Sequence, residues 1–302
     1  YVHYVPAENA HGLSIIQHGY SGGMDEDHIQ AIGKTYGEQG FNVLYIDATN
    51  SFNDSDGTVE ENSIETHLHD LEDAIEWAAS QQWYQEPFAL TGHSLGGFSV
   101  LLYAGQNPEK ISMLFPAAAV LSGNHLENAY KTHMPDYYDE YIKNGSSVVE
   151  CSFKPGLTAI KPLSWLTDMR EWDAAPLLKN LTMPVLLVVG EHDEPTPPEH
   201  QQEIYDGLAT NNKTLHIIAG ADHCYNPAPG QDKLTAILGD WLGKNKTSVT
   251  SQTNDQQKTA YKSRRRPSET AALYCSDRTA NGREYRHDGT GNAELRCNGT
   301  AP

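Results

Sequence analysis

One short stretch, residues 90–97, constrains the fold of this chain more than any other. It reads Leu-Thr-Gly-His-Ser-Leu-Gly-Gly, and it contains the pattern Gly-x-Ser-x-Gly centred on Ser94. An apolar run over residues 87–90 precedes it, and a helical pattern that begins at Gly97 follows it. A very tight strand-to-helix turn needs small residues on both sides of its apex, which explains Gly92 and Gly96. The stretch therefore predicts a buried strand that turns sharply into a helix and exposes the Ser94 hydroxyl.

Strand and helix patterns alternate along most of the remaining sequence. Apolar strand patterns occupy residues 1–5, 13–18, 41–47, 111–121, 184–190 and 214–219. Amphipathic helical patterns occupy residues 29–39, 64–80, 198–208 and 234–242, and Ser63 is a suitable N-cap for the second of these. The alternation predicts an α/β fold with a mostly parallel sheet flanked by helices. In such sheets the functional groups lie at the carboxyl ends of the strands.

Two segments do not follow this alternation. Residues 122–173 are rich in Tyr, Trp and Met and contain no clear strand for the sheet. We expect them to form a cap or lid that is inserted into a core made of residues 1–121 and 174–244. Residues 245–302 are polar and show no helical or strand pattern. We expect this tail to be disordered, or to be foreign to the native protein.

Composition excludes several kinds of partner. The net charge of −19 argues against nucleic-acid binding, which needs clustered Lys and Arg side chains. No apolar stretch reaches the roughly 18 residues of a membrane-spanning helix. The four cysteines match no zinc-binding spacing, so free thiols are expected, and a Cys275–Cys297 disulfide stays open if the protein is exported.

The start of the chain bears on its compartment. The first residue is Tyr1, and it lies inside a strand pattern rather than after an initiator methionine. We therefore expect a truncated or processed start, from which targeting information is missing. A cytoplasmic location is the default expectation, with export left open, and the oligomeric state is not readable from the sequence.

Two loops downstream of Ser94 contain partners that would make its hydroxyl nucleophilic. A serine needs a general base, and the base needs a carboxylate to orient it. Asp193 follows the strand pattern 184–190, and His223 follows the strand pattern 214–219. Both loops should emerge at the sheet edge where Ser94 lies, in the chain order serine, acid, histidine. Asp222 is the less suitable acid, because a residue adjacent to His223 rarely reaches its Nδ1 atom.

A nucleophilic serine also needs two backbone N–H groups that bind the negative charge on the oxygen of the reacting carbonyl. The N–H of Leu95, directly after Ser94, is one candidate. The second is the N–H of Tyr20, in the Gly-rich loop after the strand pattern 13–18. We therefore predict an oxyanion hole formed by Tyr20 and Leu95.

Two further clusters suggest metal binding but are better explained otherwise. Residues 67–70 read His-Leu-His-Asp, and we predict that they lie on the surface of an amphipathic helix. Asp47, Asn50, Asp54 and Asp56 do not have the spacing of a calcium-binding EF-hand loop, so we predict a solvated turn. No metal and no cofactor are expected.

With these motifs, residues 1–244 resemble the α/β-hydrolase superfamily. Within it the chain is most similar to bacterial cinnamoyl/feruloyl esterases and to monoacylglycerol-lipase-like enzymes. The stretches that carry the resemblance are residues 18–22, 54–57, 92–97 and 214–224. The resemblance implies a catalytic triad of Ser94, Asp193 and His223, oxyanion donors at Tyr20 and Leu95, and an insertion that shapes the acyl pocket.

The sequence thus predicts a serine carboxylesterase that acts on small to medium esters, including aryl or cinnamoyl esters, through an acyl-enzyme. Two alternatives use the same triad, namely a C–C bond hydrolase and a serine peptidase. A third is a binding protein with this fold and no catalytic activity.

Overall fold

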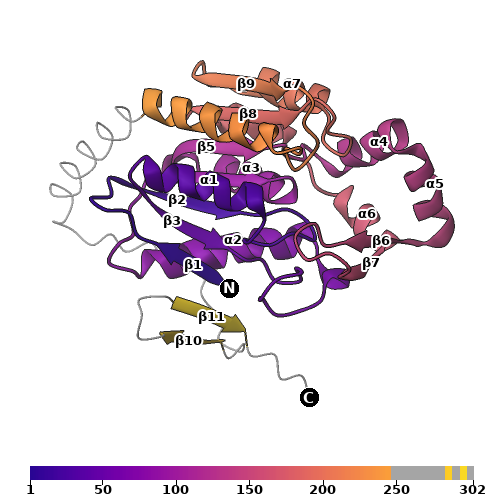
Figure 1. Ribbon diagram of the computed structural model, residues 1–302, viewed down its shortest axis with the longest axis horizontal. Coiled ribbons are helices and arrows are strands. Elements are labelled where there is room, and N and C mark those ends of the chain that lie inside the picture. The colour runs from indigo at the N-terminus through magenta and orange to yellow at the C-terminus, as the bar shows by residue number, and fades with distance from the viewer. Residues whose placement is uncertain (246–282, 288–292, 298–302) are drawn as a thin grey trace, which may run out of the picture.

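A seven-stranded sheet forms the centre of the computed structural model, which describes residues 1–245, 283–287 and 293–297 (Figure 1). The strand order is β1-β3-β2-β4-β5-β8-β9. Their bounds are β1 (Val2–Val5), β2 (Gly12–Gln17), β3 (Phe41–Ile46), β4 (Phe88–His93), β5 (Ile111–Ala117), β8 (Val185–Gly190) and β9 (Lys213–Ile218). The edge strand β1 pairs antiparallel with β3, and the other pairs are parallel. The predicted mostly parallel sheet is confirmed.

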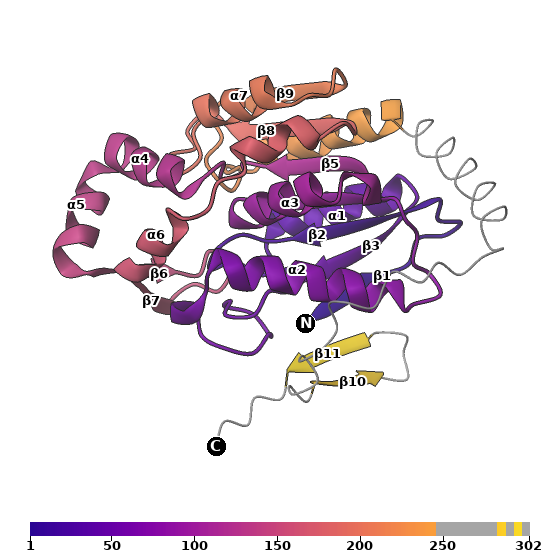
Figure 2. The ribbon, with the colours of Figure 1, turned by 180° about the vertical axis from the view of Figure 1, so that it is seen from behind.

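Helices cover both faces of this sheet. On one face lie α1 (Asp27–Glu38) and the helix 229–245 (Figure 1), and on the other lie α2 (Ile64–Ala79) and α3 (Leu95–Gln106) (Figure 2). Neighbouring residues of one strand pack on opposite faces, as Ile15 and Ile16 of β2 do. Because both faces are buried, these strands have continuous apolar sequences rather than alternating ones.

The start of α2 follows from its sequence. The Ser63 hydroxyl accepts the backbone N–H of Thr66 at 3.0 Å, and the Thr66 hydroxyl accepts the backbone N–H of Ser63 at 3.0 Å. This reciprocal cap satisfies two N–H groups that have no partner inside the helix. The predicted N-cap at Ser63 is confirmed.

Residues 122–173 fold outside the central sheet. They form α4 (Gly123–His133), α5 (Pro135–Asn144), β6 (Ser146–Glu150), β7 (Thr158–Pro162) and α6 (Leu163–Met169), with β6 and β7 paired antiparallel to each other. Figures 1 and 2 both show these elements together at one end of the sheet. The two ends of the segment meet in a bridge between Ser122 and Asp173. After it, η3 (Ala175–Asn180) leads into β8, and α7 (Pro198–Gly207) connects β8 to β9.

The C-terminal segment departs from the expectation of no regular structure. Strands β10 (Arg283–His287) and β11 (Ala293–Cys297) pair antiparallel. The predicted closing helix is present and is longer than expected, since it spans 229–245. The remainder of the predicted tail, including Cys275, lies outside the described residues, so the Cys275–Cys297 disulfide stays a prediction, while Cys151 and Cys224 are free thiols. Within the described residues, no helix combines the length and the apolar character needed to cross a membrane.

Candidate active site

Ser94 lies at the junction of β4 and α3, in a backbone conformation that non-glycine residues rarely adopt. Its φ is 57° and its ψ is −115°. A Cβ atom on Gly92 would lie 2.2 Å from the Gly96 carbonyl oxygen, and one on Gly96 would lie 2.3 Å from the His18 carbonyl oxygen. Both contacts are with backbone atoms, which cannot move aside as a flexible side chain could. The close packing therefore requires both glycines and holds Ser94 at the end of β4.

The structure brings together the three residues predicted as a triad. Nε2 of His223 lies 2.9 Å from Oγ of Ser94, and Nδ1 of His223 lies 2.8 Å from Oδ2 of Asp193. Asp193 follows β8 and His223 follows β9, so the parallel strands deliver both side chains to one edge of the sheet. Asp222 does not contact the imidazole in this way, because its Oδ1 accepts the backbone N–H groups of Cys224 and Asn226.

Thr196, which was not among the residues predicted from the sequence, fixes the Asp193 carboxylate. The Thr196 backbone N–H donates to Oδ1 of Asp193 at 2.8 Å, and its hydroxyl lies 3.0 Å from both carboxylate oxygens. These contacts orient Oδ2 toward His223. Asp side chains often accept a backbone N–H a few residues later in turns, so the spacing from Asp193 to Thr196 was the signal available.

Two buried histidines support the loop that carries His223. Nε2 of His93 lies 2.9 Å from the His223 carbonyl oxygen, so it carries the proton and donates. Nδ1 of His93 then accepts from Nε2 of His28 at 3.1 Å. Burial, followed by the nearby charge of His223, lowers the pKa of His28 to about 3. Burial also holds the pKa of His93 well below its usual range, so both rings are neutral.

The environment of His223 changes its basicity. Burial alone would lower the pKa of the imidazole, but the negative charge of Asp193 and its hydrogen bond raise it. Glu26 and Asp222 add to the upward shift. The net pKa lies above the ordinary value of 6.5, which makes His223 a stronger base than a free histidine.

The loop that contains Tyr20 passes directly over Ser94. A Cβ atom on Gly19 would lie 2.9 Å from Cβ of Ser94. Nε2 of His18 accepts the Ala48 N–H at 2.9 Å, so the proton of this ring is on Nδ1, which donates to the Gly19 carbonyl at 2.8 Å. In a trans peptide the carbonyl and the following N–H point in opposite directions, so this bond turns the Tyr20 N–H away from His18.

Leu95 is the first residue of α3. N–H groups in the first turn of a helix lack an acceptor within the helix and attract negative charge. The loop that contains Tyr20 and the first turn of α3 therefore both lie beside Ser94.

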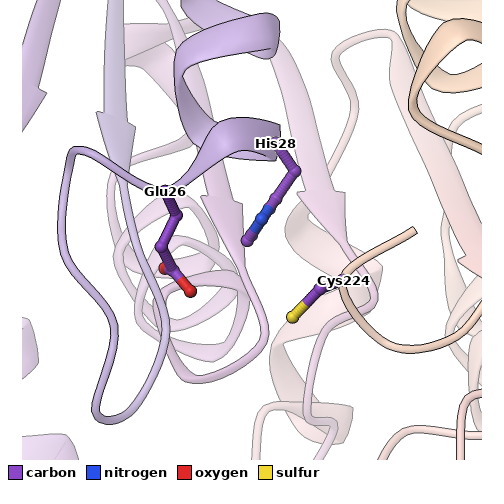
Figure 3. Close-up of side chains that lie close together, drawn as sticks. All are labelled: Glu26, His28 and Cys224. Atoms are coloured by element: carbon purple, nitrogen blue, oxygen red, sulfur yellow. The ribbon is translucent and has the colours of Figure 1, made fainter. Parts of the chain in front are cut away.

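Glu26, His28 and Cys224 form a cluster next to His223, with potential metal-ligating atoms within 4.8 Å of one another (Figure 3). Two of these side chains, Glu26 and His28, already have hydrogen-bond partners within the protein. Glu26 accepts from Ser152 Oγ at 2.7 Å and from the Gly23 N–H, and His28 donates to His93. Burial, followed by the charges of Glu26, Asp222 and Asp193, raises the pKa of the Cys224 thiol, which disfavours the thiolate that a metal would need. The cluster therefore supports the loops around His223.

The two stretches that were predicted not to bind metal, residues 67–70 and the acidic residues of the segment 47–56, are more buried than expected. The prediction of a surface position is wrong for His67, which is fully buried against the ring of His18. The predicted solvated turn is also wrong for Asp47, a buried residue whose Oδ2 accepts the backbone N–H groups of Asp54 and Ser55. The loop after β3 therefore folds around a buried carboxylate.

Two comparisons of the sequence with other proteins give matches. The family of X-Pro dipeptidyl-peptidases (S15 family) matches residues 13–157, a range that includes Ser94 but ends before Asp193 and His223. An uncharacterized 31.7 kDa protein in the traX-finO intergenic region of Escherichia coli is 24% identical over 271 residues, which cover 80% of this chain and 93% of that protein.

Solved structures of esterases and lipases resemble more than 80% of the chain. Est1E from Butyrivibrio proteoclasticus, solved with ferulic acid bound, is 21% identical with a TM-score of 0.67, covering 82% of this chain and 95% of that chain. A monoacylglycerol lipase from Paleococcus ferrophilus is 21% identical with a TM-score of 0.61, covering 81% and 98%. Together with the strand order and the sharp turn at Ser94, these similarities show that the chain has the α/β-hydrolase fold.

Proposed function

We propose that this protein is a serine carboxylesterase. The contact between His223 Nε2 and Ser94 Oγ carries the proposal, since it places a base of raised pKa within hydrogen-bond distance of the serine hydroxyl. His223 takes the hydroxyl proton as Ser94 Oγ attacks the ester carbonyl carbon, and Asp193 stabilises the imidazolium that forms. The Tyr20 and Leu95 N–H groups bind the oxyanion.

The second half of the reaction uses the same residues. When the tetrahedral intermediate collapses, the carbon–oxygen bond to the alcohol breaks and His223 gives its proton to the leaving oxygen. Water then attacks the acyl group on Ser94, with His223 again accepting the proton, and the free acid is released. These steps need no metal and no cofactor.

Residues 122–173 are proposed to cap this site and to shape its acyl pocket. Contacts with the loops around Ser94 support this role. The Ser152 hydroxyl donates to Glu26, and the Trp165 ring packs on the Tyr20 ring with 4.8 Å between the ring centres. The similarity to Est1E and to a monoacylglycerol lipase supports small to medium carboxylic esters, including cinnamoyl esters, as substrates.

The match to the X-Pro dipeptidyl-peptidase family favours a serine peptidase as the second candidate function. A substrate panel separates the candidates: p-nitrophenyl esters of rising acyl length, methyl ferulate, Gly-Pro-p-nitroanilide and a meta-cleavage product as the C–C substrate. We expect the highest kcat/KM with an ester. A higher value with the anilide would replace esterase by peptidase. Absence of turnover together with no labelling by a fluorophosphonate probe would indicate a binding protein.

The pH dependence of ester hydrolysis tests the role of His223. We expect kcat/KM for p-nitrophenyl butyrate to fall as the pH decreases, because only neutral His223 can accept the Ser94 proton. Since its pKa is raised, the midpoint of this decrease should lie above pH 6.5. The rate is followed at the isosbestic wavelength of p-nitrophenol, so that ionisation of the product does not distort the profile. A midpoint well below pH 6.5 would rule out the proposed environment of His223.

A further inference from the structure

Lys161, in β7 of the insertion, is a buried lysine without a carboxylate partner. Only 3% of its surface is exposed, and no ion pair of the described residues includes it. Its Nζ donates one hydrogen bond, to the hydroxyl of Tyr130 at 3.1 Å. An ammonium group has three N–H donors, and a buried charge is costly unless it is paired. The structure therefore leaves the charge of Lys161 largely uncompensated.

Aromatic rings surround this ammonium group. Nζ lies 3.7 Å from the ring centre of Trp165, 4.7 Å from that of Tyr20 and 5.2 Å from that of Tyr130. The faces of aromatic rings attract cations, so this cage favours the charged form. Burial acts in the opposite direction and lowers the pKa of Lys161 to about 7. The aromatic rings thus compensate only part of the free energy that the ammonium group loses when it leaves water.

Two further donors beside Lys161 have no hydrogen-bond partner in the described structure. They are the hydroxyl of Tyr20 and Nε1 of Trp165, and both atoms are buried. The Trp165 side chain is 5% exposed. An indole Nε1–H can only donate, and a phenol can donate as well as accept. The side chains of Tyr20 and Trp165, which both pack against Lys161 Nζ, therefore each carry a buried donor without a partner, and a negatively charged acceptor would satisfy these donors together with the ammonium.

Tyr20 connects these donors to the proposed reaction centre. Its backbone belongs to the loop that passes over Ser94, and its ring faces Lys161. A single residue, Tyr20, therefore links the buried donors to the proposed oxyanion hole. The whole chain carries a net charge of −19, so an anionic substrate needs a local cation to overcome the general repulsion.

We propose that Lys161 Nζ, Tyr20 Oη and Trp165 Nε1 form a subsite that binds a carboxylate of the substrate. The preferred substrates are then esters with a second, ionised carboxyl group, such as monoesters of dicarboxylic acids. This inference rests on the proposed esterase function and adds the substrate class. A carboxylate fits because it has two oxygens that accept hydrogen bonds and a charge that pairs with the ammonium.

Matched pairs of esters test the subsite. The mono-p-nitrophenyl esters of adipic, suberic and sebacic acid are compared with the same compounds whose free carboxylate is capped as a methyl ester. We expect the ionised ester of the best length to have a kcat/KM about 10- to 100-fold higher, mainly through a lower KM, as hydrogen bonds to a charged group provide. Equal or higher kcat/KM for the capped esters at every length would overturn the proposal.

Variants attribute this preference to Lys161. In Lys161→Met the ratio of kcat/KM between ionised and capped ester should fall to about one. In the control Lys143→Met, which removes an exposed lysine from α5 of the same insertion, the ratio should not change. Trp165→Phe keeps an aromatic ring but removes the N–H donor together with the second ring of the indole, so it should lower the ratio in part. An unchanged ratio in folded Lys161→Met would contradict the assignment.

A binding measurement on the unmodified protein is independent of turnover and of the folding of any variant. Titration calorimetry should detect binding of adipate and a much weaker response to its neutral diamide. If no ester is cleaved but adipate binds, the esterase proposal fails and the subsite stands. If esters are cleaved but adipate does not bind, the subsite is wrong and the esterase proposal stands.

Discussion

Ser94→Ala should lower kcat for p-nitrophenyl butyrate by at least about 10³-fold. The substitution removes Oγ, which lies 2.9 Å from His223 Nε2 and is the proposed nucleophile. The remaining rate would come from water held near the oxyanion donors. Alanine retains the Cβ atom, so the turn between β4 and α3 should still form, and the circular dichroism spectrum should match that of the unmodified protein.

Ser99→Ala is the matched control for this substitution. Ser99 lies in the same helix α3 and is fully buried, and its hydroxyl donates to the Leu95 carbonyl at 3.2 Å. The same chemical change at this position should leave ester hydrolysis within a few-fold of the original rate. If Ser94→Ala retained the original kcat, or if a fluorophosphonate probe still labelled it at the same rate, another residue would have to be the nucleophile.

Asp193→Asn should lower kcat by about 10²- to 10⁴-fold, with little change in KM. In the protein, Oδ1 of Asp193 accepts the Thr196 N–H, and Oδ2 faces His223 Nδ1. An asparagine would keep its oxygen on the Thr196 N–H, so its NH₂ group would face Nδ1. The imidazole proton would then move to Nε2, and His223 could no longer accept the proton of the serine hydroxyl.

Asp222→Asn is the control that distinguishes the two neighbouring candidate acids. Oδ1 of Asp222 accepts two backbone N–H groups, and an amide oxygen can accept both as well. We expect this variant to keep nearly full activity, and its pH midpoint should shift down slightly, since one negative charge near His223 is lost. A large loss in Asp222→Asn with full activity in Asp193→Asn would reverse the assignment of the acid.

The positions of Ser94, Asp193 and His223 were predictable because Ser94 directly follows strand β4, while Asp193 and His223 lie in the loops after β8 and β9. Parallel strands end at the same edge, so three loops that are distant in sequence must meet there. The tight turn at Ser94 was predictable for a local reason, because the backbone contacts of such a turn leave no room for a Cβ atom at positions 92 and 96. In both cases the pattern in the sequence determines the spatial arrangement almost alone.

Contacts between segments that no pattern connects were not predictable. His28 and His93 meet only because α1 packs beside β4, and Lys161 appears in the sequence as an ordinary lysine in a short polar strand. The error at His67 was avoidable, because this residue lies three positions after Ile64 and four before Leu71, on the apolar face of α2.

The first and last residues of the segment 122–173 lie side by side, which affects how the sequence of this protein can change in evolution. The chain leaves the core and returns at one point, where Ser122 pairs with Asp173 and where Ala174 N donates to the Leu121 carbonyl at 3.0 Å. A different segment of any length could be exchanged at this point without moving β5 or β8. In the proposed role of this segment as a cap over the acyl pocket, replacing one continuous piece of sequence would change acyl specificity and leave Ser94, Asp193 and His223 in the core.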